Sequence, residues 1–432
     1  MKALRAFRKG SENLHMEKLL VLGATASETT LVKRAKEYGY YVIVTDNHKD
    51  WDLSPAKYVA DEAWDVSWSD IDTLEQMCRE HGVHGATAGY SEFRVENLIK
   101  LCERMGYPCY ITEDQLDITR DKIKFKDACR KFGVPTVREY ASPNQVDRFP
   151  VIIKPVDRAG SIGIGIATDR ESLNRAYAYA LDMSVCKQAI IEDFITDQVK
   201  VDFYYAVEAG EIRQISSCDT INAKENGFER VVQSAWLYPM VQRPALEEAD
   251  RQMRNMIRGM GIEYGCITFS GFVDEEGHFT AFECGFRMEG AHQYNYVYRR
   301  GLMNFLDVFI LHAMTGGTKG MVRPTVFNPE LKCVTVNLYA KEGTIARIEG
   351  MGRIGTMEDC SLALVQTHVG AVCKLDKAIL TRVGMFAFCS DSPKKLRQDV
   401  EKAYELFSVT DENGNDMLYD RIDTALIEYW WD

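Results

Sequence analysis

The sequence predicts an α/β and α+β protein: an N-terminal doubly wound parallel sheet, a central region of mixed strands and helices, and a mainly β C-terminal module. Before residue 111, short apolar runs alternate with helical periodicity, which is typical of parallel sheets. A central apolar run ends in a lysine and is followed by three closely spaced glycines, and the pattern from residue 325 onward is mostly strand-like. A chain of 432 residues is long enough for two or three domains.

We expect four segments along the chain. Residues 1–15 are basic without a long apolar core, and they are expected to form a mobile extension. An N-terminal Rossmann-like domain is expected over 16–111, a second domain over 112–318, and the C-terminal module over 319–432.

The expected N-terminal domain alternates strands and helices. The predicted elements are strands at 18–22, 41–45 and 84–88, and helices at about 27–37 and 70–80. Gly23 and Asp46 follow the first two strands and could belong to a dinucleotide-binding fingerprint, but Thr25 and Glu28 stand where its other glycines are required. An NAD site therefore stays an alternative to a sheet that serves structure or substrate binding.

The central region begins with a helix that opens at Asp121-Lys122 and stops near Gly133-Val134-Pro135. The elements expected after it are strands at 190–195 and 201–207, helices at 171–183 and 303–315, and a hairpin of 264–274 with 278–285. Near the C-terminus, Ser392 before Pro393 predicts the start of a charged helix that reaches Glu405.

Two segments carry the chemistry. In FPVIIKPVDRAGSIGIGIA (149–167), Lys154 ends a strand, and the glycines that follow let backbone N–H groups approach an anion closely. In FTAFECGFRMEGAHQ (279–293), Glu283 and Arg287 lie at the end of another strand. A carboxylate for Mg²⁺ and an arginine for phosphate or carboxylate suit phosphoryl transfer, so the sequence predicts an ATP-dependent enzyme.

Composition excludes several classes of protein. No apolar stretch approaches the ~18 residues of a membrane span, and the net charge of −12 disfavours nucleic-acid binding. Twelve cysteines without a CxxC pair indicate reduced thiols and hence a cytoplasmic protein.

The ordered set of Asp121-Lys122, VIIKP, AGSIGIG, IIEDFI and FECGFR resembles the ATP-grasp superfamily. The resemblance is at the level of biotin carboxylase, the carbamoyl-phosphate synthetase large chain and the amino-acid ligases, and it covers almost the whole chain from residue 16. It implies an ATP-grasp fold after the N-terminal domain. It also implies ATP contacts from Lys122, Lys154, Ser161, Ile162, Gly163, Glu192, Asp193, Ile195 and Lys200.

The resemblance gives each of these residues a role. Lys122 and Lys154 would contact phosphate oxygens, and the backbone of 161–163 would cover the triphosphate. Glu192 would lie near the exocyclic amine of adenine, and the backbone of Asp193 and of Ile195 would bind the adenine edge. Lys200 stands where the family usually has an acid for the ribose, so the ribose contacts depart from the pattern.

The implied metal site also departs from the family pattern. Glu283 matches one Mg²⁺ ligand and Arg287 the following arginine. Ser270 stands in place of a first glutamate, and Gly285 in place of an asparagine. Glu289 could compensate. Because Mg²⁺ keeps waters and is held by few carboxylates, these losses do not exclude activity.

The resemblance implies an ATP-dependent carbon–nitrogen ligase that joins a small-molecule carboxylate, amino-acid-like, to an amine through an acyl phosphate. ATP and Mg²⁺ are the expected cofactors, and a homodimer is the assembly considered. Arg230, in the polar segment Asn222–Trp236 expected to be a loop, could pair with a substrate carboxylate, or it could be a solvated surface arginine.

Two other functions stay open. A degenerate ATP-grasp protein would bind nucleotide without turnover, and Ser270 and Gly285 favour it. A biotin-dependent carboxylase is disfavoured because Ala291 stands where that group has an acid, and because its glycine loop is longer.

Overall fold

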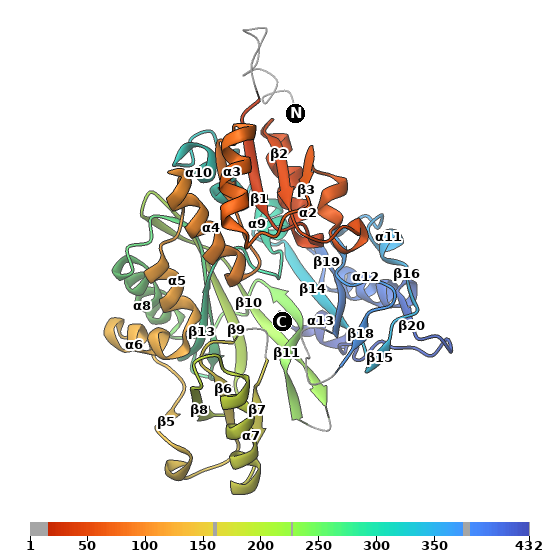
Figure 1. Cartoon of the computed structure of the whole chain (residues 1–432). Coiled ribbons are helices and arrows are strands. Elements are labelled where there is room, and N and C mark those ends of the chain that lie inside the picture. Colours follow the sequence, from red (N-terminus) through yellow and green to blue (C-terminus); the bar gives the residue numbers. More distant parts are fainter. Residues whose placement is uncertain (1–15, 159–161, 226–227, 375–380, 432) are drawn as a thin grey trace. The chain divides into compact units, whose positions relative to one another are not determined.

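The computed structural model describes residues 16–158, 162–225, 228–374 and 381–431 (Figure 1). The expected N-terminal extension lies outside these ranges. Contacts within the chain define two compact units, one of 1–113 with 304–323 and one of 114–303 with 324–432. The domain boundaries expected at 111 and 318 stay a prediction.

The first unit is built on a parallel four-stranded sheet in the order β3-β2-β1-β4, as the alternating pattern predicts. The strands are β1 (Lys18–Leu22), β2 (Tyr41–Thr45), β3 (Glu62–Trp64) and β4 (Gly85–Thr87), and the helices between them are α2 (Ala26–Glu37), α3 (Ile71–His81) and α4 (Glu92–Met105), with short 3-10 turns at Trp51–Leu53 and Pro55–Tyr58. The interiors of β1 and β2 are fully buried.

Helix α10 (Leu306–Thr315) belongs to this first unit although it follows the central region in sequence. Arg34 of α2 donates from Nε and Nη2 to the two carboxylate oxygens of Asp307, each at 2.7 Å. Because Asp307 is fully buried, this paired contact anchors α10 to the sheet domain.

The second unit contains an antiparallel eight-stranded sheet in the order β13-β12-β9-β10-β11-β14-β19-β17. Its strands are β9 (Val199–Glu208), β10 (Glu211–Glu225), β11 (Phe228–Tyr238), β12 (Tyr264–Val273), β13 (Phe279–Phe286), β14 (Lys332–Tyr339), β17 (Cys360–Val365) and β19 (Arg382–Ser390). The expected C-terminal module therefore contributes three strands to the same sheet as the central region.

The described parts of Asn222–Trp236, residues 222–225 and 228–236, are strands, which corrects the loop expected from the sequence. They belong to β10 and β11, which pair with each other with register shifts near Asn222. The polar composition is misleading here because β10 and β11 pair with each other, and β11 gains a further partner in β14, far away in sequence.

A second, smaller sheet of this unit has the order β5-β8-β6-β7. It comprises β5 (Glu139–Tyr140), β6 (Val151–Pro155), β7 (Gly165–Ala167) and β8 (Ala189–Asp193), and α7 (Arg170–Met183) packs along it (Figure 1). Asp169 caps α7 by accepting from Ser172 N at 2.8 Å.

The remaining helices of the unit flank these sheets. They are α5 (Glu113–Arg120), α6 (Lys122–Phe132), α8 (Leu246–Gly259), α9 (Tyr294–Arg299), α11 (Met351–Ile354), α12 (Pro393–Leu406) and α13 (Ala425–Tyr429), with minor strands β15 (Gly343–Thr344), β16 (Arg347–Glu349), β18 (Val372–Cys373) and β20 (Ser408–Thr410) and a 3-10 turn at Pro143–Gln145. Ser392 caps α12 as predicted, accepting from Lys395 N at 3.3 Å.

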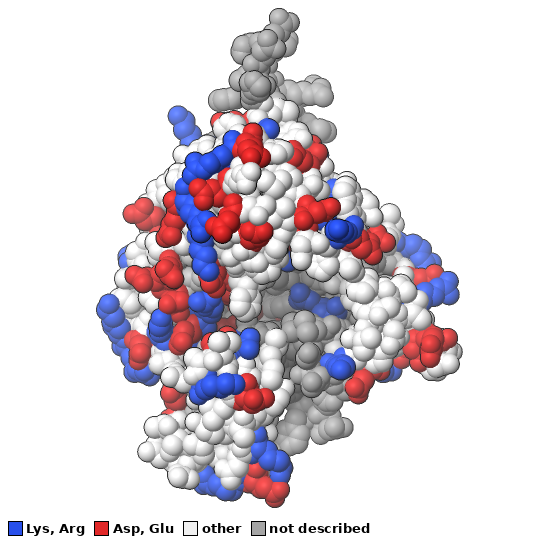
Figure 2. All heavy atoms as spheres, in the orientation of Figure 1, with Lys and Arg blue, Asp and Glu red and all other residues white. Residues whose placement is uncertain are grey.

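Within the described ranges, no helix combines the length and apolar character needed to cross a membrane. Figure 2 shows acidic and basic side chains interspersed over the face in view.

Candidate functional site

Two lysines predicted to contact ATP meet at one aromatic ring. Lys154 ends β6 of the small sheet, and Lys200 lies in β9 of the large sheet. Their Nζ atoms lie 5.3 and 5.2 Å from the centre of the Phe282 ring. Since Phe282 directly precedes Glu283, the contacts bring together the cation and the carboxylate segments that the sequence singled out.

Glu192 of β8 holds two lysines in a buried cluster. Its Oε2 lies 2.5 Å from Lys154 Nζ, and its Oε1 forms an ion pair with Lys126 of α6. Glu192 and Lys126 are almost completely excluded from solvent. Burial raises the pKa of Glu192, but the charges of Lys154 and Lys126 outweigh it and hold that pKa below its ordinary value.

The side chain of Glu192 is therefore already engaged by cations, and its proposed position near adenine stays a prediction. Asp193 also directs its carboxylate into the protein, where Oδ1 accepts from Tyr140 OH at 2.8 Å and from Arg148 Nε at 3.0 Å. Its backbone N–H donates to Arg138 O. Ile195 lies just beyond the end of β8 and is partly exposed.

Lys122 lies at the first turn of α6, where Asp121 accepts from the N–H groups of Ile123 and Lys124. Lys122 Nζ donates to Arg158 O at 2.7 Å, on the segment that leaves β6 toward the glycine loop. The first turn of α6 therefore lies against the glycine-loop segment.

The glycine loop is partly described. Ser161 lies outside the described residues, Ile162 is partly exposed, and Gly163 is buried with a φ of +77°. A Cβ on Gly163 would lie 2.7 Å from Pro155 Cγ and 2.8 Å from Met183 Cβ. A side chain is excluded both by the backbone conformation and by the close approach to β6 and α7.

The expected metal segment lies on β12 and β13. Ser270 is opposite Glu283 in the register of the two strands, and Glu283 is exposed. A Cβ on Gly285 would lie 2.9 Å from Glu289 Oε1, so the carboxylate of Glu289 fills the space beside the glycine. Glu289 also lies 3.3 Å from Arg287 Nη1.

A buried carboxylate, Asp202 of β9, borders this segment. Its Oδ1 accepts from Ser270 Oγ at 2.6 Å, and its Oδ2 accepts from Trp236 Nε1 at 3.1 Å and Tyr204 OH at 3.3 Å. Burial raises the pKa of Asp202, against the opposing effects of the Lys200 charge and of these hydrogen bonds.

A further arginine lies near the loop that follows Arg287. The Nη atoms of Arg382, on β19, lie 3.9 Å from the place of a Cβ on Gly290. Among the residues that the structure describes, no carboxylate forms an ion pair with Arg382, and burial lowers its pKa. Burial of His292, together with the charge of Arg382, lowers the pKa of His292 to about 3, so this imidazole is neutral.

The described side chains around Glu283 do not form a complete set of metal ligands. Of the described His, Cys, Asp and Glu side chains, one group of three has ligand atoms within 4.8 Å of one another, and it lies at the partly exposed turn of Asp274, Glu276 and His278. Mg²⁺ can be held by one or two carboxylates when its other ligands are phosphates and water, so Glu283 is a residue that could hold such an ion.

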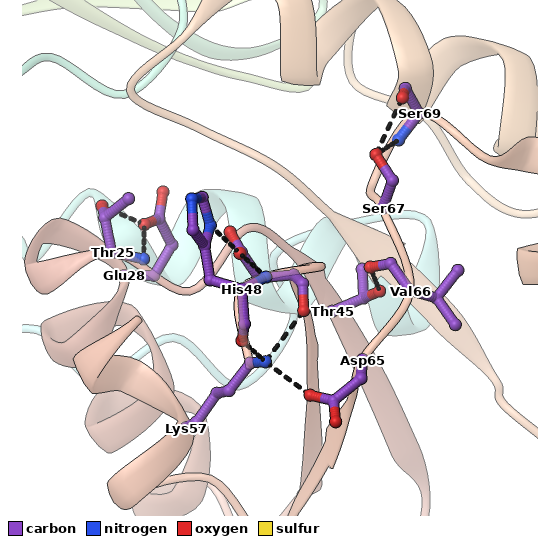
Figure 3. Close-up of polar contacts among 10 residues, drawn as sticks. Thr25, Glu28, Thr45, His48, Lys57, Asp65, Val66, Ser67 and Ser69 are labelled. Atoms are coloured by element: carbon purple, nitrogen blue, oxygen red, sulfur yellow. Dashed lines mark hydrogen bonds and ion pairs between the residues drawn. The ribbon is translucent and has the colours of Figure 1, made fainter. Parts of the chain in front are cut away.

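At the carboxyl edge of the sheet in the first unit, side chains pair with one another where a dinucleotide would bind. Figure 3 shows Thr25 and Glu28 facing each other, with Thr25 N donating to Glu28 Oε2 at 2.8 Å. The buried Glu28 also pairs with Arg94 at 2.5 Å. A carboxylate at this helix N-terminus takes the place that a dinucleotide phosphate needs, so the geometry disfavours the NAD alternative.

Lys57 closes the adjacent part of the same edge. Its Nζ donates to Asp46 O, His48 O and Asp65 Oδ1 at 2.8, 2.6 and 2.7 Å (Figure 3). Because Lys57 is buried and its three donors are used, it links the segments that follow β2 and β3.

Residues 121–293 match the sequence profile of the family described as carbamoyl-phosphate synthase L chain, ATP binding domain. This part of the chain is an ATP-grasp domain. The match begins at Asp121, the N-cap of α6, and ends beyond Arg287, so it includes all the predicted nucleotide and metal residues.

Curated relatives of the ATP-grasp domain are enzymes. The chain is 25% identical to the formate-dependent phosphoribosylglycinamide formyltransferase of Synechococcus sp. (strain RCC307), over 56% of this chain and 63% of that protein. It is 30% identical to the D-alanine–D-alanine ligase of Fusobacterium nucleatum, over 37% of this chain and 53% of that enzyme. The chain thus spans between about half and two thirds of the length of these two relatives.

Solved structures share the fold over nearly the whole chain. The L-amino acid ligase from Bacillus licheniformis has a TM-score of 0.73 at 15% identity, with 94% of this chain and 100% of that chain covered. The biotin carboxylase domain of the Hydrogenobacter thermophilus 2-oxoglutarate carboxylase, in complex with MgADP and bicarbonate, has a TM-score of 0.73 at 17% identity, with 92% and 91% covered. These likenesses confirm the predicted fold class.

Three residues beside the predicted ATP-grasp site were missed from the sequence: Lys126, Asp202 and Arg382. Lys126 follows Lys122 by four residues in one helix, and Asp202 follows Lys200 by two in one strand, so each shares a face with a predicted residue. These spacings could have indicated both. Arg382 has no such signal, because β19 reaches this sheet from far along the chain.

Proposed function

We propose that the chain is an ATP-dependent carboxylate–amine ligase that forms an amide through an acyl phosphate. One observation carries the proposal: Lys154 and Lys200, from two different sheets, both contact Phe282, which directly precedes Glu283. Cations for phosphate oxygens and a carboxylate for metal are the groups that phosphoryl transfer requires, and positioning and charge stabilisation provide most of its catalysis.

The proposed reaction has two steps. A carboxylate oxygen of the substrate attacks the γ-phosphorus of ATP, and ADP leaves. The amine nitrogen then attacks the acyl carbon, phosphate leaves with the bonding electron pair, and the nitrogen loses a proton. Lys122 and Lys154 would hold phosphate oxygens, together with the backbone of 161–163, and Arg287 would stabilise the transferring phosphoryl group.

Mg²⁺ would neutralise the phosphate charge when bound. Glu283 is the proposed protein ligand. Glu289 could provide the ligand that the missing asparagine would have supplied, because its carboxylate fills the space beside Gly285.

We propose that the acid substrate is a small, amino-acid-like carboxylate. Two arginines are candidates for a carboxylate of a substrate. Arg230 is a residue of strand β11, and its side chain is outside the described part of the chain. Arg382 carries a charge that no described carboxylate pairs with, which favours an anionic ligand. A homodimer and a cytoplasmic location stay predictions.

Mg-ATP should raise the melting temperature of the protein, because a ligand that binds only the folded state stabilises it by RT ln(1 + [L]/Kd). At a hundred times Kd the stabilisation is about 2.7 kcal/mol. Differential scanning fluorimetry with ATP, ADP and Mg²⁺ measures the shift. An unchanged melting temperature, in an assay where a known nucleotide-binding protein responds, would contradict the proposal.

Arg287→Lys should impair turnover nearly as much as Arg287→Ala, since a point charge does not replace a planar guanidinium that binds two oxygens at once. Phosphate release with a panel of amino acids first identifies a substrate pair, and kcat/KM of both variants is then compared. Arg251→Lys, on the exposed surface of α8, is the matched control. Full activity in Arg287→Lys would assign Arg287 a structural role.

A protein that binds nucleotide without turnover is the second candidate. Ser270 and Gly285 favour it, since neither offers a carboxylate or amide oxygen. Nucleotide binding without phosphate release across the amino-acid panel would support it over the ligase.

A further inference from the structure

Ser270 lies in the sheet between two acidic residues, and its hydroxyl is hydrogen-bonded to one of them. Along the sheet, Ser270 of β12 is directly opposite Asp202 of β9 on one side and Glu283 of β13 on the other. Side chains of directly opposed residues share a face and have Cβ atoms about 4.5–5.5 Å apart. The position that lacks the expected acid thus lies between an exposed acid and a buried one.

The hydrogen bond fixes what the hydroxyl can do. A serine hydroxyl has one proton to donate and two lone pairs to accept with. Ser270 Oγ donates to Asp202 Oδ1 at 2.6 Å, a distance typical of a charge-assisted O–H···O⁻ bond. Its proton is used, so its lone pairs are the part left to face a ligand, and Ser270 is only partly buried.

Asp202 itself is enclosed. It is 4% exposed, and its second oxygen already accepts from Trp236 Nε1 and Tyr204 OH. A negative charge behind the hydroxyl increases the electron density on the serine oxygen, as partners behind metal ligands do generally. Asp202 can therefore act on a cation through Ser270, without contact of its own.

We propose that Ser270 and Asp202 together replace the absent first carboxylate of the magnesium site, Ser270 as an oxygen ligand to the ion or to one of its waters and Asp202 as the positioning residue behind it. This inference rests on the proposed function. It assigns to the serine a part in metal binding that the absence of a carboxylate at this position does not suggest, because a neutral hydroxyl brings no charge to the ion.

A plain structural role is the competing explanation. Asp202 could serve to satisfy Trp236 and Tyr204 inside the sheet, with Ser270 as one more donor. The two explanations differ in whether removal of the hydroxyl changes metal affinity while nucleotide affinity without metal stays constant.

The test is calorimetric titration of Mg²⁺ into the full chain saturated with a non-hydrolysable ATP analogue, with titration of the analogue without metal in parallel. Ser270→Ala and Asp202→Asn should each lower the affinity for Mg²⁺ about 10- to 100-fold, which is the usual effect of losing a group behind a metal ligand. Metal-free analogue affinity should not change. Ser270→Asp combined with Asp202→Asn moves the carboxylate one strand toward Glu283 and should restore Mg²⁺ binding.

A second serine–aspartate hydrogen bond, from a serine of the same sheet, provides matched controls. Ser234 Oγ of β11 donates to Asp420 Oδ2 at 3.3 Å, three strands away from Ser270. Ser234→Ala and Asp420→Asn should leave Mg²⁺ affinity unchanged.

The outcomes separate the inference from the proposed function. If the parent binds Mg²⁺ with the analogue and Ser270→Ala binds it equally well, the inference is overturned and the ligase proposal stands. If the parent binds no Mg²⁺ even with the analogue, both are overturned. If Asp202→Asn fails to fold, Ser270→Ala decides the matter by itself, because it removes the hydroxyl and leaves the buried Asp202 in place.

Discussion

Glu192→Gln is expected to lower the free energy of unfolding by about 3–5 kcal/mol, the usual cost of removing one partner from a buried ion pair. Glu192 is the shared partner of Lys126 and Lys154, and all three side chains are buried. The amide keeps the shape of the carboxylate but leaves two buried cations without their counter-charge. Urea denaturation of parent and variant gives the difference.

The effect should depend on pH in a definite direction. The pKa of Glu192 is held below its ordinary value of 4.5 in the folded protein. The ionised group therefore stabilises the fold fully above pH 4.5, and this contribution is lost as the pH falls through the lower pKa of the folded state. The parent–variant difference should be constant from pH 8 to about 5 and shrink only in more acidic solution.

Glu139→Gln is the matched control. Glu139 lies 3.1 Å from the same Lys126 but is exposed, so its loss should cost less than about 1 kcal/mol. If both variants lose the same small free energy of unfolding, Glu192 is not the counter-charge of the buried lysines.

Lys154→Ala should weaken ATP and ADP binding about tenfold to a hundredfold. A charge-assisted hydrogen bond is worth roughly 1.5–3 kcal/mol, and each 1.4 kcal/mol corresponds to a factor of about ten in affinity. Calorimetric titration of ADP measures the loss. Because Lys154 also pairs with Glu192, the variant's unfolding free energy is measured beside it.

Lys126→Ala separates the two roles of Lys154. Lys126 pairs with the same carboxylate and donates to Val137 O, and it has no predicted phosphate contact. Its loss should affect stability while nucleotide affinity stays close to the parent value. Equal nucleotide affinity in the parent and in Lys154→Ala would rule out a phosphate role for Lys154.

Much of the secondary structure is predictable from local patterns. The strands Lys18–Leu22 and Tyr41–Thr45 coincide with their predicted bounds because each is a short apolar run ended by Gly23 or Asp46. Helix α6 begins at its Asp121 cap and ends at Gly133, whose φ is +76°. Such signals are local, because each involves only residues a few positions apart in the sequence.

The candidate site was predictable to the extent that its chemistry is carried by motifs within one segment. Lys154 and its glycines, and Glu283 with Arg287, each lie within about a dozen residues of sequence. Their common location could not be derived from either segment, because Lys154 and Lys200 reach Phe282 from two separate sheets.

Residue types and periodicity in this chain were sufficient for its fold class, most of its helices and strands, and the residues expected to bind a nucleotide. Only the folded chain shows that Glu192 pairs with two lysines, that Asp202 accepts a hydrogen bond from Ser270, and that residues 222–225 and 228–236 are strands. The first two features depend on strand register and burial between residues distant in sequence, and β11 also pairs with the distant strand β14. Such pairings depend on the whole sheet, and a local sequence pattern does not predict them.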